Sequence, residues 1–259
     1  MLQTIEAGEG EERRRIAVLA RPGDGPPVVW LGGFRSDMRA TKAEALDAWA
    51  AGQGRAFVRF DYSGHGEAEG RFEEGTISRW LEDALAVIER FVSAPPILVG
   101  SSMGGWIALL AARALRARKS PLAPTFLVLI APAPDFTERL MWASFDEAAR
   151  RAILEEGVWQ RPSLYAPESY PITRALIEDG RRHLLLDGPI ETGCPVHILQ
   201  GMEDPDVPWT YAMRLLEQLP GEEVAMTLVK DGDHRLSRAQ DIDRLIAAVE
   251  AASATVSGG

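Results

Sequence analysis

Ser102 lies in a stretch whose residue types and spacing suit nucleophilic catalysis. The run ILVGSSMGGW, residues 97–106, places two serines among glycines between two apolar stretches. Gly100 and Gly104 flank Ser102 in the frame G-x-S-x-G, the nucleophile elbow that joins a strand to a helix. So sharp a turn strains its central residue, exposes its hydroxyl and favours glycine at the crowded flanking positions. Ser102 is the predicted nucleophile, because a frame centred on Ser101 would put larger side chains at those positions.

A glycine-rich phosphate-binding turn is the alternative interpretation of this stretch. The stretch lacks the G-K-[ST] ending of a P-loop and the G-x-G-x-x-G pattern of a dinucleotide site. The sequence therefore favours the nucleophile elbow, which requires a general base and an acid elsewhere in the chain.

His234 has the position that a general base requires. It follows the last strand candidate in the loop KDGDH, and in elbow enzymes the chain order is nucleophile, acid, histidine. The chain has 4 histidines, and the other three fit this order poorly. We interpret His65, which precedes the elbow, as a loop-packing residue, His183 as a surface residue and His197 as part of a strand in the core.

The acid should lie on the loop after the strand that precedes the histidine. The run HILQGMEDPDVPW, residues 197–209, supplies several carboxylates at this point. Asp204 is the predicted acid and Asp206 is its competitor. We interpret Asp206 as a cap for the helix that starts near Pro208, where a carboxylate would meet free amides. A paired-carboxylate metal site is another interpretation, but no histidine pair stands at ligand spacing, so we expect no metal.

Two backbone amides are predicted to stabilise the negative charge that develops on the substrate oxygen. One belongs to Met103, directly after the nucleophile, and the other to Phe34, after the glycines at 32–33. A plain glycine turn is the alternative at the second position. Trp106 and Trp209 are candidates for the substrate pocket, with ordinary core packing as an equal alternative.

Short apolar runs alternate with helical patterns, and this alternation predicts the scaffold that positions these residues. Nearly continuous apolar strands separated by helices indicate an α/β fold, with a mostly parallel sheet covered by helices on both faces. The expected strands are Arg15–Leu19, Val28–Leu31, Ala56–Phe60, Ile97–Val99, Phe126–Ile130, Val196–Gln200 and Val224–Val229. The expected helices are 41–52, 76–93, 103–117, 208–219 and 238–252.

One interval, from Ala131 to Gly193, is too long for a single crossover helix. It is rich in aromatic residues and prolines. We expect a single domain over residues 1–259 with a small helical cap inserted at about 134–190, over one end of the sheet. An extra crossover helix with long loops is the alternative.

Composition narrows the classes of partner. The chain has 259 residues, of which 46% are hydrophobic and 25% charged, and a formal net charge of −10. The acidic balance argues against nucleic acid or an anionic membrane surface as a partner, and no apolar run reaches the roughly 20 residues of a membrane span. The single cysteine, Cys194, excludes an internal disulfide and fits a reducing compartment. The charged N-terminal stretch has no apolar signal core, so we expect a cytoplasmic protein.

These residues resemble the α/β-hydrolase superfamily. Three motifs of this superfamily accompany the elbow: the D-x-x-G-x-G loop at 61–66, the acid loop G-x-x-D-x-x-V-P at 201–208 and the D-H pair at 233–234. The resemblance extends over about 28–245. A branch of mitochondrial thioesterases and acyl-glucuronide esterases has runs similar to SDMRATKA, RFDYSGHG, GSSMGGW, GMEDPDVPW and DGDHR. In contrast to that branch, we expect no transit peptide and a different cap. The spacing of the acid loop favours Asp204.

The resemblance implies an α/β-hydrolase fold and serine hydrolysis of esters or thioesters through an acyl-enzyme, without a cofactor. The expected partner is a small-molecule or acylated substrate, and the oligomeric state stays open. A non-catalytic binding protein on the same fold is one alternative. Peptidase, carbon–carbon-bond hydrolase and acyltransferase chemistry are the others. A dehalogenase or epoxide hydrolase is disfavoured, because it would need a carboxylate where Ser102 stands.

Overall fold

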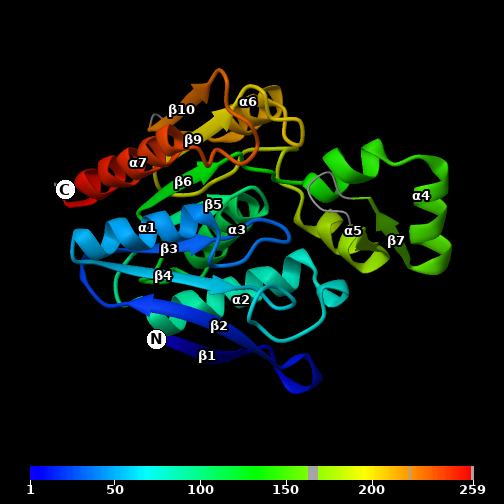
Figure 1. Ribbon diagram of the computed structural model, residues 1–259, viewed down its shortest axis with the longest axis horizontal. Helices are drawn as coiled ribbons and strands as arrows, with labels where there is room; N and C mark the ends of the chain where they lie inside the picture. Colours follow the sequence, from blue (N-terminus) through cyan, green and yellow to red (C-terminus); the bar gives the residue numbers. More distant parts are fainter. Residues whose placement is uncertain (163–168, 222, 258–259) are drawn as a thin grey trace.

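An eight-stranded sheet forms the centre of the protein (Figure 1). The structure is a computed structural model that describes residues 1–162, 169–221 and 223–257. The strand order is β1-β2-β4-β3-β5-β6-β9-β10, and β1–β2 and β2–β4 pair antiparallel whereas every other pair is parallel. These strands are β1 (Leu2–Ala7), β2 (Arg14–Arg21), β3 (Asp24–Leu31), β4 (Arg55–Asp61), β5 (Ile97–Ser101), β6 (Phe126–Ile130), β9 (Val196–Gly201) and β10 (Val224–Val229).

The mostly parallel sheet is confirmed, and β1 is the strand of this sheet that the sequence analysis missed. β1 lies at the edge of the sheet, and most of its residues are exposed. Its sequence LQTIEA lacks the continuous apolar character by which the central strands were identified. An edge strand with one solvated face carries a weaker signal in the sequence.

Helices cover both faces of the sheet, as predicted. Alternate side chains of each strand point to opposite faces, so Val29 and Leu31 join one core cluster and Val28 and Trp30 the other. The helices α1 (Thr41–Gly52) and α7 (Ala239–Ser257) contribute to the cluster that contains Trp30. The opposite cluster takes residues from α2 (Ile77–Phe91), α3 (Met103–Ala117) and α6 (Trp209–Gln218).

The segment between β6 and β9, residues 131–195, starts at the carboxyl end of β6, and most of its described elements lie to one side of the sheet (Figure 1). We call it the β6–β9 segment. It contains short helices and a two-stranded antiparallel sheet that the sequence analysis did not predict, because each strand has only 4 residues. Its elements are α4 (Glu147–Arg151), β7 (Val158–Arg161), β8 (Tyr170–Thr173) and α5 (Arg174–Gly180).

Several single-turn helices complete the described chain. They are η1 (Gly10–Glu12), η2 (Phe72–Glu74), η3 (Thr137–Met141), η4 (Trp142–Ser144), η5 (Ala152–Glu156) and η6 (Arg181–His183), of which η3 and η5 are π-helical. No helix in the described part of the chain combines the length and the apolar character that crossing a membrane requires.

Candidate active site

Ser102 occupies the turn between β5 and α3 in a strained backbone conformation. Its φ and ψ are 55° and −116°, a backbone conformation that residues other than glycine rarely adopt. A Cβ atom added at Gly100 would lie 2.4 Å from the carbonyl oxygen of Gly104, and one added at Gly104 would lie 2.1 Å from that of Leu31. Only glycine fits at both positions, which is the physical reason for the predicted G-x-S-x-G spacing.

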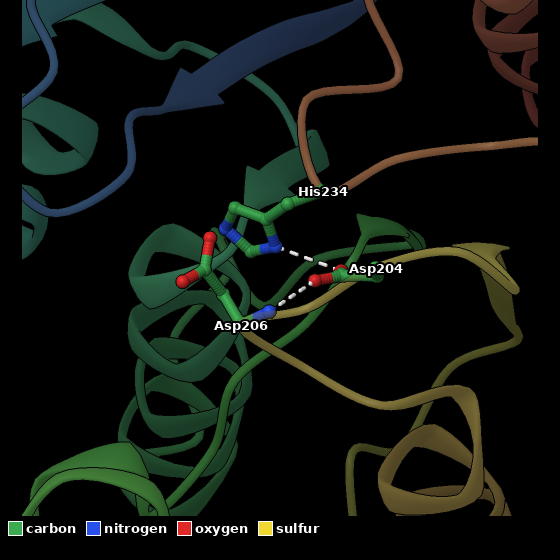
Figure 2. Close-up of side chains that lie close together, drawn as sticks. All are labelled: Asp204, Asp206 and His234. Atoms are coloured by element: carbon green, nitrogen blue, oxygen red, sulfur yellow. Dashed lines mark hydrogen bonds and ion pairs between the residues drawn. The ribbon is translucent and has the colours of Figure 1, made fainter. Parts of the chain in front are cut away.

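The three predicted polar side chains lie together at the carboxyl edge of the sheet. His234 Nε2 lies 3.1 Å from Ser102 Oγ, and His234 Nδ1 lies 2.8 Å from Asp204 Oδ2. Figure 2 shows the second contact. The three residues follow β5, β9 and β10, whose parallel alignment brings their carboxyl ends to one edge. The arrangement matches the geometry of a nucleophile, a base and an orienting acid.

Asp204 is held by four hydrogen bonds in a buried position. Its Oδ1 accepts from the amides of Asp206 and Val207 at 2.9 and 2.8 Å, and its Oδ2 accepts from Gln200 Nε2 at 3.2 Å in addition to His234. Gln200 is fully buried, and the sequence analysis missed it. Its position at the end of the strand before the acid loop was the available signal. With Nδ1–H donating to this fixed carboxylate, Nε2 is left to accept the serine proton.

The structure corrects the interpretation of Asp206. The N-cap residue of α6 is Pro208, which makes no side-chain capping hydrogen bond, and not Asp206. The Asp206 carboxylate instead lies beside the His234 imidazole (Figure 2). The reason is local, because Asp204 binds the amides of the next two residues and turns the backbone so that the Asp206 side chain faces the histidine. The prediction that Asp206 caps α6 is wrong.

Asp204, Asp206 and His234 could offer a cation three ligand atoms that all lie within 4.8 Å of one another. Both oxygens of Asp204 already accept hydrogen bonds from the protein. A metal bound here would have to compete with these donors and with the bond that orients the imidazole. The geometry therefore suits histidine orientation better than metal binding.

The two predicted oxyanion amides belong to a residue that follows the serine and to a loop that passes close to it. A Cβ atom added at Gly33 would lie 3.5 Å from Ser102 Cβ, so the loop after β3 passes close to the nucleophile. Met103 directly follows the serine at the start of α3. Within the described ranges, neither the Phe34 amide nor the Met103 amide donates a hydrogen bond to the protein. Both are available to a bound substrate.

The two pocket candidates differ in their surroundings. Trp106 is fully buried on α3, where its Nε1 donates to the carbonyl of His183 at 3.1 Å and its ring lies 5.6 Å from that of Phe136. Trp106 therefore packs the core beneath the β6–β9 segment. Trp209 is the first residue of α6 and is half-buried.

Aromatic and cationic side chains that the sequence analysis did not assign surround the loop after β3. The Phe34 ring centroid lies 6.1 Å from that of Tyr170 on β8, and the Arg35 guanidinium lies 4.4 Å from the Tyr170 centroid. Sequence spacing gives no signal for these contacts, because β8 lies far along the chain. They bring the β6–β9 segment against the loop that carries a predicted oxyanion donor.

His183, His197 and the cysteine lie outside this arrangement. His183 Nε2 lies 2.7 Å from Ser78 Oγ, and His197 Nε2 lies 2.9 Å from Thr227 Oγ1 on the neighbouring strand. His183 is half-buried and thus differs from the expected surface residue. Burial raises the pKa of the Cys194 thiol to about 11, which keeps it protonated and a poor nucleophile.

The family model described as "Alpha/beta hydrolase family" matches residues 17–248. The chain belongs to this family. The mitochondrial palmitoyl-protein thioesterase ABHD10 of Bos taurus is 35% identical over 250 residues, which cover 91% of this chain and 79% of the relative.

Solved structures agree with this membership of the alpha/beta hydrolase family. A crystal structure from Agrobacterium vitis S4, described as a candidate hydrolase, has a TM-score of 0.95 and 51% identity over 98% of each chain. The structure of mouse alpha/beta hydrolase domain-containing protein 10 has a TM-score of 0.84 and 31% identity, covering 96% of this chain and 97% of its own. The predicted α/β-hydrolase fold and the resemblance are thereby confirmed.

Proposed function

We propose that this protein is a serine hydrolase that cleaves carboxylic esters or thioesters through an acyl-enzyme on Ser102. The observation that carries the proposal is the continuous chain from Ser102 Oγ to His234 Nε2 at 3.1 Å and from His234 Nδ1 to Asp204 Oδ2 at 2.8 Å. A non-catalytic binding protein would not require all three side chains in this alignment.

In the acylation step, His234 takes the proton from Ser102 as the hydroxyl oxygen attacks the acyl carbonyl carbon. Asp204 keeps the imidazole in the required orientation and stabilises the imidazolium that forms. The amides of Phe34 and Met103 donate to the oxyanion of the tetrahedral intermediate. Collapse of this intermediate breaks the bond to the leaving alcohol or thiol, which receives the proton from His234.

The deacylation step repeats this chemistry with water as the nucleophile. His234 removes a proton from water as its oxygen attacks the acyl-enzyme carbonyl, and the same two amides hold the second oxyanion. Collapse releases the carboxylic acid and returns the proton to Ser102. These steps use side chains, amides and water, so the proposed reaction needs no cofactor.

The relatives and the aromatic surroundings support an apolar acyl group and a thiol or alcohol leaving group. The bovine relative is named a palmitoyl-protein thioesterase. In this chain, Phe34, which follows the Gly33 that approaches Ser102, contacts the rings of Phe72, Phe136 and Tyr170. Such a surface suits an apolar acyl chain better than a polar peptide.

A fluorophosphonate probe tests the proposed nucleophile. It should form a covalent adduct that peptide mass spectrometry maps to Ser102, and Ser102→Ala should abolish both labelling and turnover. Loss of the nucleophile costs on the order of a million-fold in turnover. Ser101→Ala is the matched control and should label like the wild type, because Ser101 ends β5 and is not the residue bonded to His234.

The substrate class is tested with a panel of acyl esters, acyl thioesters, acyl glucuronides and peptides. Hydrolysis of the first three without cleavage of peptides agrees with the proposal. An adduct on Ser101, or unchanged turnover in Ser102→Ala, would contradict the proposed nucleophile. Labelling at Ser102 without hydrolysis of any ester or thioester would point to one of the other serine chemistries.

A further inference from the structure

The loop after β3, residues 32–36, contains a strained residue next to the predicted oxyanion donor. The amide of Ser36 donates to the carbonyl of Gly33 at 3.1 Å, which closes a four-residue turn. Arg35, the third residue of this turn, has a φ of 59°. This is the pattern of a type II turn, which favours glycine at that position. An arginine there is strained, so contacts from elsewhere in the fold must hold it.

His65 makes the contact that holds this turn. The amide of Arg35 donates to His65 Nε2 at 3.1 Å, across 30 positions of the sequence. That amide belongs to the central peptide of the turn, whose orientation distinguishes a type II from a type I turn. The adjacent peptide carries the amide of Phe34. His65 therefore fixes the peptide plane that directly follows the predicted oxyanion donor.

His65 is itself held rigidly and in a defined protonation state. It is 5% exposed, and its ring centroid lies 5.9, 5.3 and 5.3 Å from those of Tyr62, Phe72 and Trp80. Its Nδ1 donates to the carbonyl of Ser63 at 3.2 Å, which leaves Nε2 as the acceptor. Burial lowers the pKa of His65 to about 4, so the ring is neutral at neutral pH and keeps this acceptor.

We propose that His65 is a positioning residue for the oxyanion hole: through the Arg35 peptide, its Nε2 holds the Phe34 amide in the orientation that the tetrahedral intermediate requires. This inference rests on the proposed function. His65 contacts neither the nucleophile nor the base in the structure, so its loss should act on the stabilisation of the intermediate and leave substrate binding unchanged. Removal of a whole oxyanion donor costs about 100-fold to 1000-fold in kcat. A misplaced donor should cost on the order of tenfold to 100-fold.

Three substitutions of His65 separate the loss of its hydrogen-bond acceptor from the loss of its ring packing. His65→Phe keeps an aromatic ring among its neighbours but removes the acceptor, and His65→Leu serves if the larger ring does not fit. His65→Gln retains an acceptor oxygen. Tyr62→Phe is the matched control, because the buried Tyr62 hydroxyl has no hydrogen-bond partner among the described residues although its ring contacts His65.

The readouts are kcat and KM for a soluble acyl ester and the inhibition constant of an alkyl boronic acid. The boronic acid forms a tetrahedral adduct with the serine and so reports on the oxyanion hole. We expect His65→Phe to lower kcat and to weaken boronic-acid inhibition by similar factors, with KM within about threefold of the wild type. His65→Gln should recover part of both losses, and Tyr62→Phe should match the wild type.

A double-mutant cycle with Arg35→Gly tests whether His65 acts on the oxyanion donor through the Arg35 peptide. Glycine adopts a positive φ without strain, so the turn no longer needs the bond to His65. The kcat loss caused by His65→Phe should therefore be several-fold smaller when Arg35→Gly is also present. Equal losses in both backgrounds, or wild-type kcat and boronic-acid inhibition in His65→Phe, would overturn the inference. Hydrolysis that persists in Ser102→Ala would instead overturn the proposed function, so the two failures are distinguishable.

Discussion

Two regions of the molecule meet beside Ser102, and they are built from different interactions. At the carboxyl edge of the sheet, directional hydrogen bonds of 2.8 to 3.2 Å hold Asp204 and His234. The β6–β9 segment has hydrogen bonds of its own, such as those from the amides of Leu185 and Leu186 to Asp135, and adds aromatic contacts that the sheet edge lacks in the described part of the chain. Examples are Phe145 with Trp159 at a centroid distance of 4.9 Å and Arg150 over Trp142 at 5.5 Å.

The difference between the two regions predicts how each responds to substitution. A hydrogen bond weakens steeply with small changes in distance and angle, whereas apolar packing depends mainly on volume and area. The sheet edge should therefore determine the rate of the chemical step, and the β6–β9 segment should determine which acyl groups are accepted. Asp204→Asn, Asp206→Asn and Tyr170→Ala test this division, and His65→Phe tests the buried histidine that supports the loop after β3.

Asp204→Asn should produce the largest effect. An amide at this position favours the wrong histidine tautomer, which lowers turnover about ten-thousand-fold in the corresponding arrangement of other enzymes. The side chain keeps its size, so the melting temperature should change little. Steady-state kinetics with thermal unfolding checks this expectation. Near wild-type turnover in this variant would show that the hydrogen-bonded edge does not control the chemistry.

His65 should make stability depend on pH between about 4 and 6.5. Its pKa is about 4 in the folded protein and 6.5 in the reference state, so the unfolded chain binds the proton first as the pH falls. This contribution to stability is complete above pH 6.5 and is lost progressively toward pH 4, amounting to about 3 kcal/mol.

Urea unfolding at several pH values measures this slope, which should be shallower in His65→Phe than in the wild type. His183→Phe in the β6–β9 segment is the control. Burial also lowers the pKa of His183, but this half-buried ring keeps part of its contact with water. Its substitution should change the slope less. Identical slopes of stability against pH in the wild type and His65→Phe would contradict the expectation that His65 causes this pH dependence.

Asp206→Asn should lower kcat by no more than about tenfold. The carboxylate lies beside the His234 imidazole and is partly exposed, and a charge pair at about 4 Å in a water-like surrounding contributes about 1 kcal/mol. The variant loses the charge that favours the imidazolium but leaves the bond between Asp204 and His234 in place. Kinetics of Asp204→Asn and Asp206→Asn, measured in parallel, check that the loss of kcat is larger at position 204. A larger loss at 206 would reverse the assignment of the acid.

The smallest effect on the chemical step should come from the β6–β9 segment. A methylene group buried in an apolar pocket contributes about 0.8 kcal/mol, or roughly fourfold in kcat/KM. Specificity should therefore rise with acyl chain length until the pocket is full. Tyr170→Ala removes a ring that contacts Phe34 and should reduce this gain per methylene while leaving acetyl-ester kcat within about threefold. A kinetic panel from acetyl to octanoyl esters in both proteins measures it, and a flat series in the wild type contradicts an apolar pocket.

Short-range features of the sequence determined a large part of the fold and of the candidate site. The elbow could be recognised because close backbone contacts at Gly100 and Gly104 exclude other residue types at the two positions that flank Ser102. The order of Ser102, Asp204 and His234 followed from strands that end at one edge. The central strands and the five long helices were visible because their burial imposes periodic apolar patterns.

Tertiary structure alone decided the features that depend on distant backbone. The sequence analysis missed β1 at the exposed edge and the four-residue strands β7 and β8, because short or solvated strands leave little pattern. The bond from the Arg35 amide to His65 forms only after β3 and β4 pair and bring their following loops together. The conformation of the turn at residues 33–36 depends on this long-range contact, which residue spacing alone does not encode.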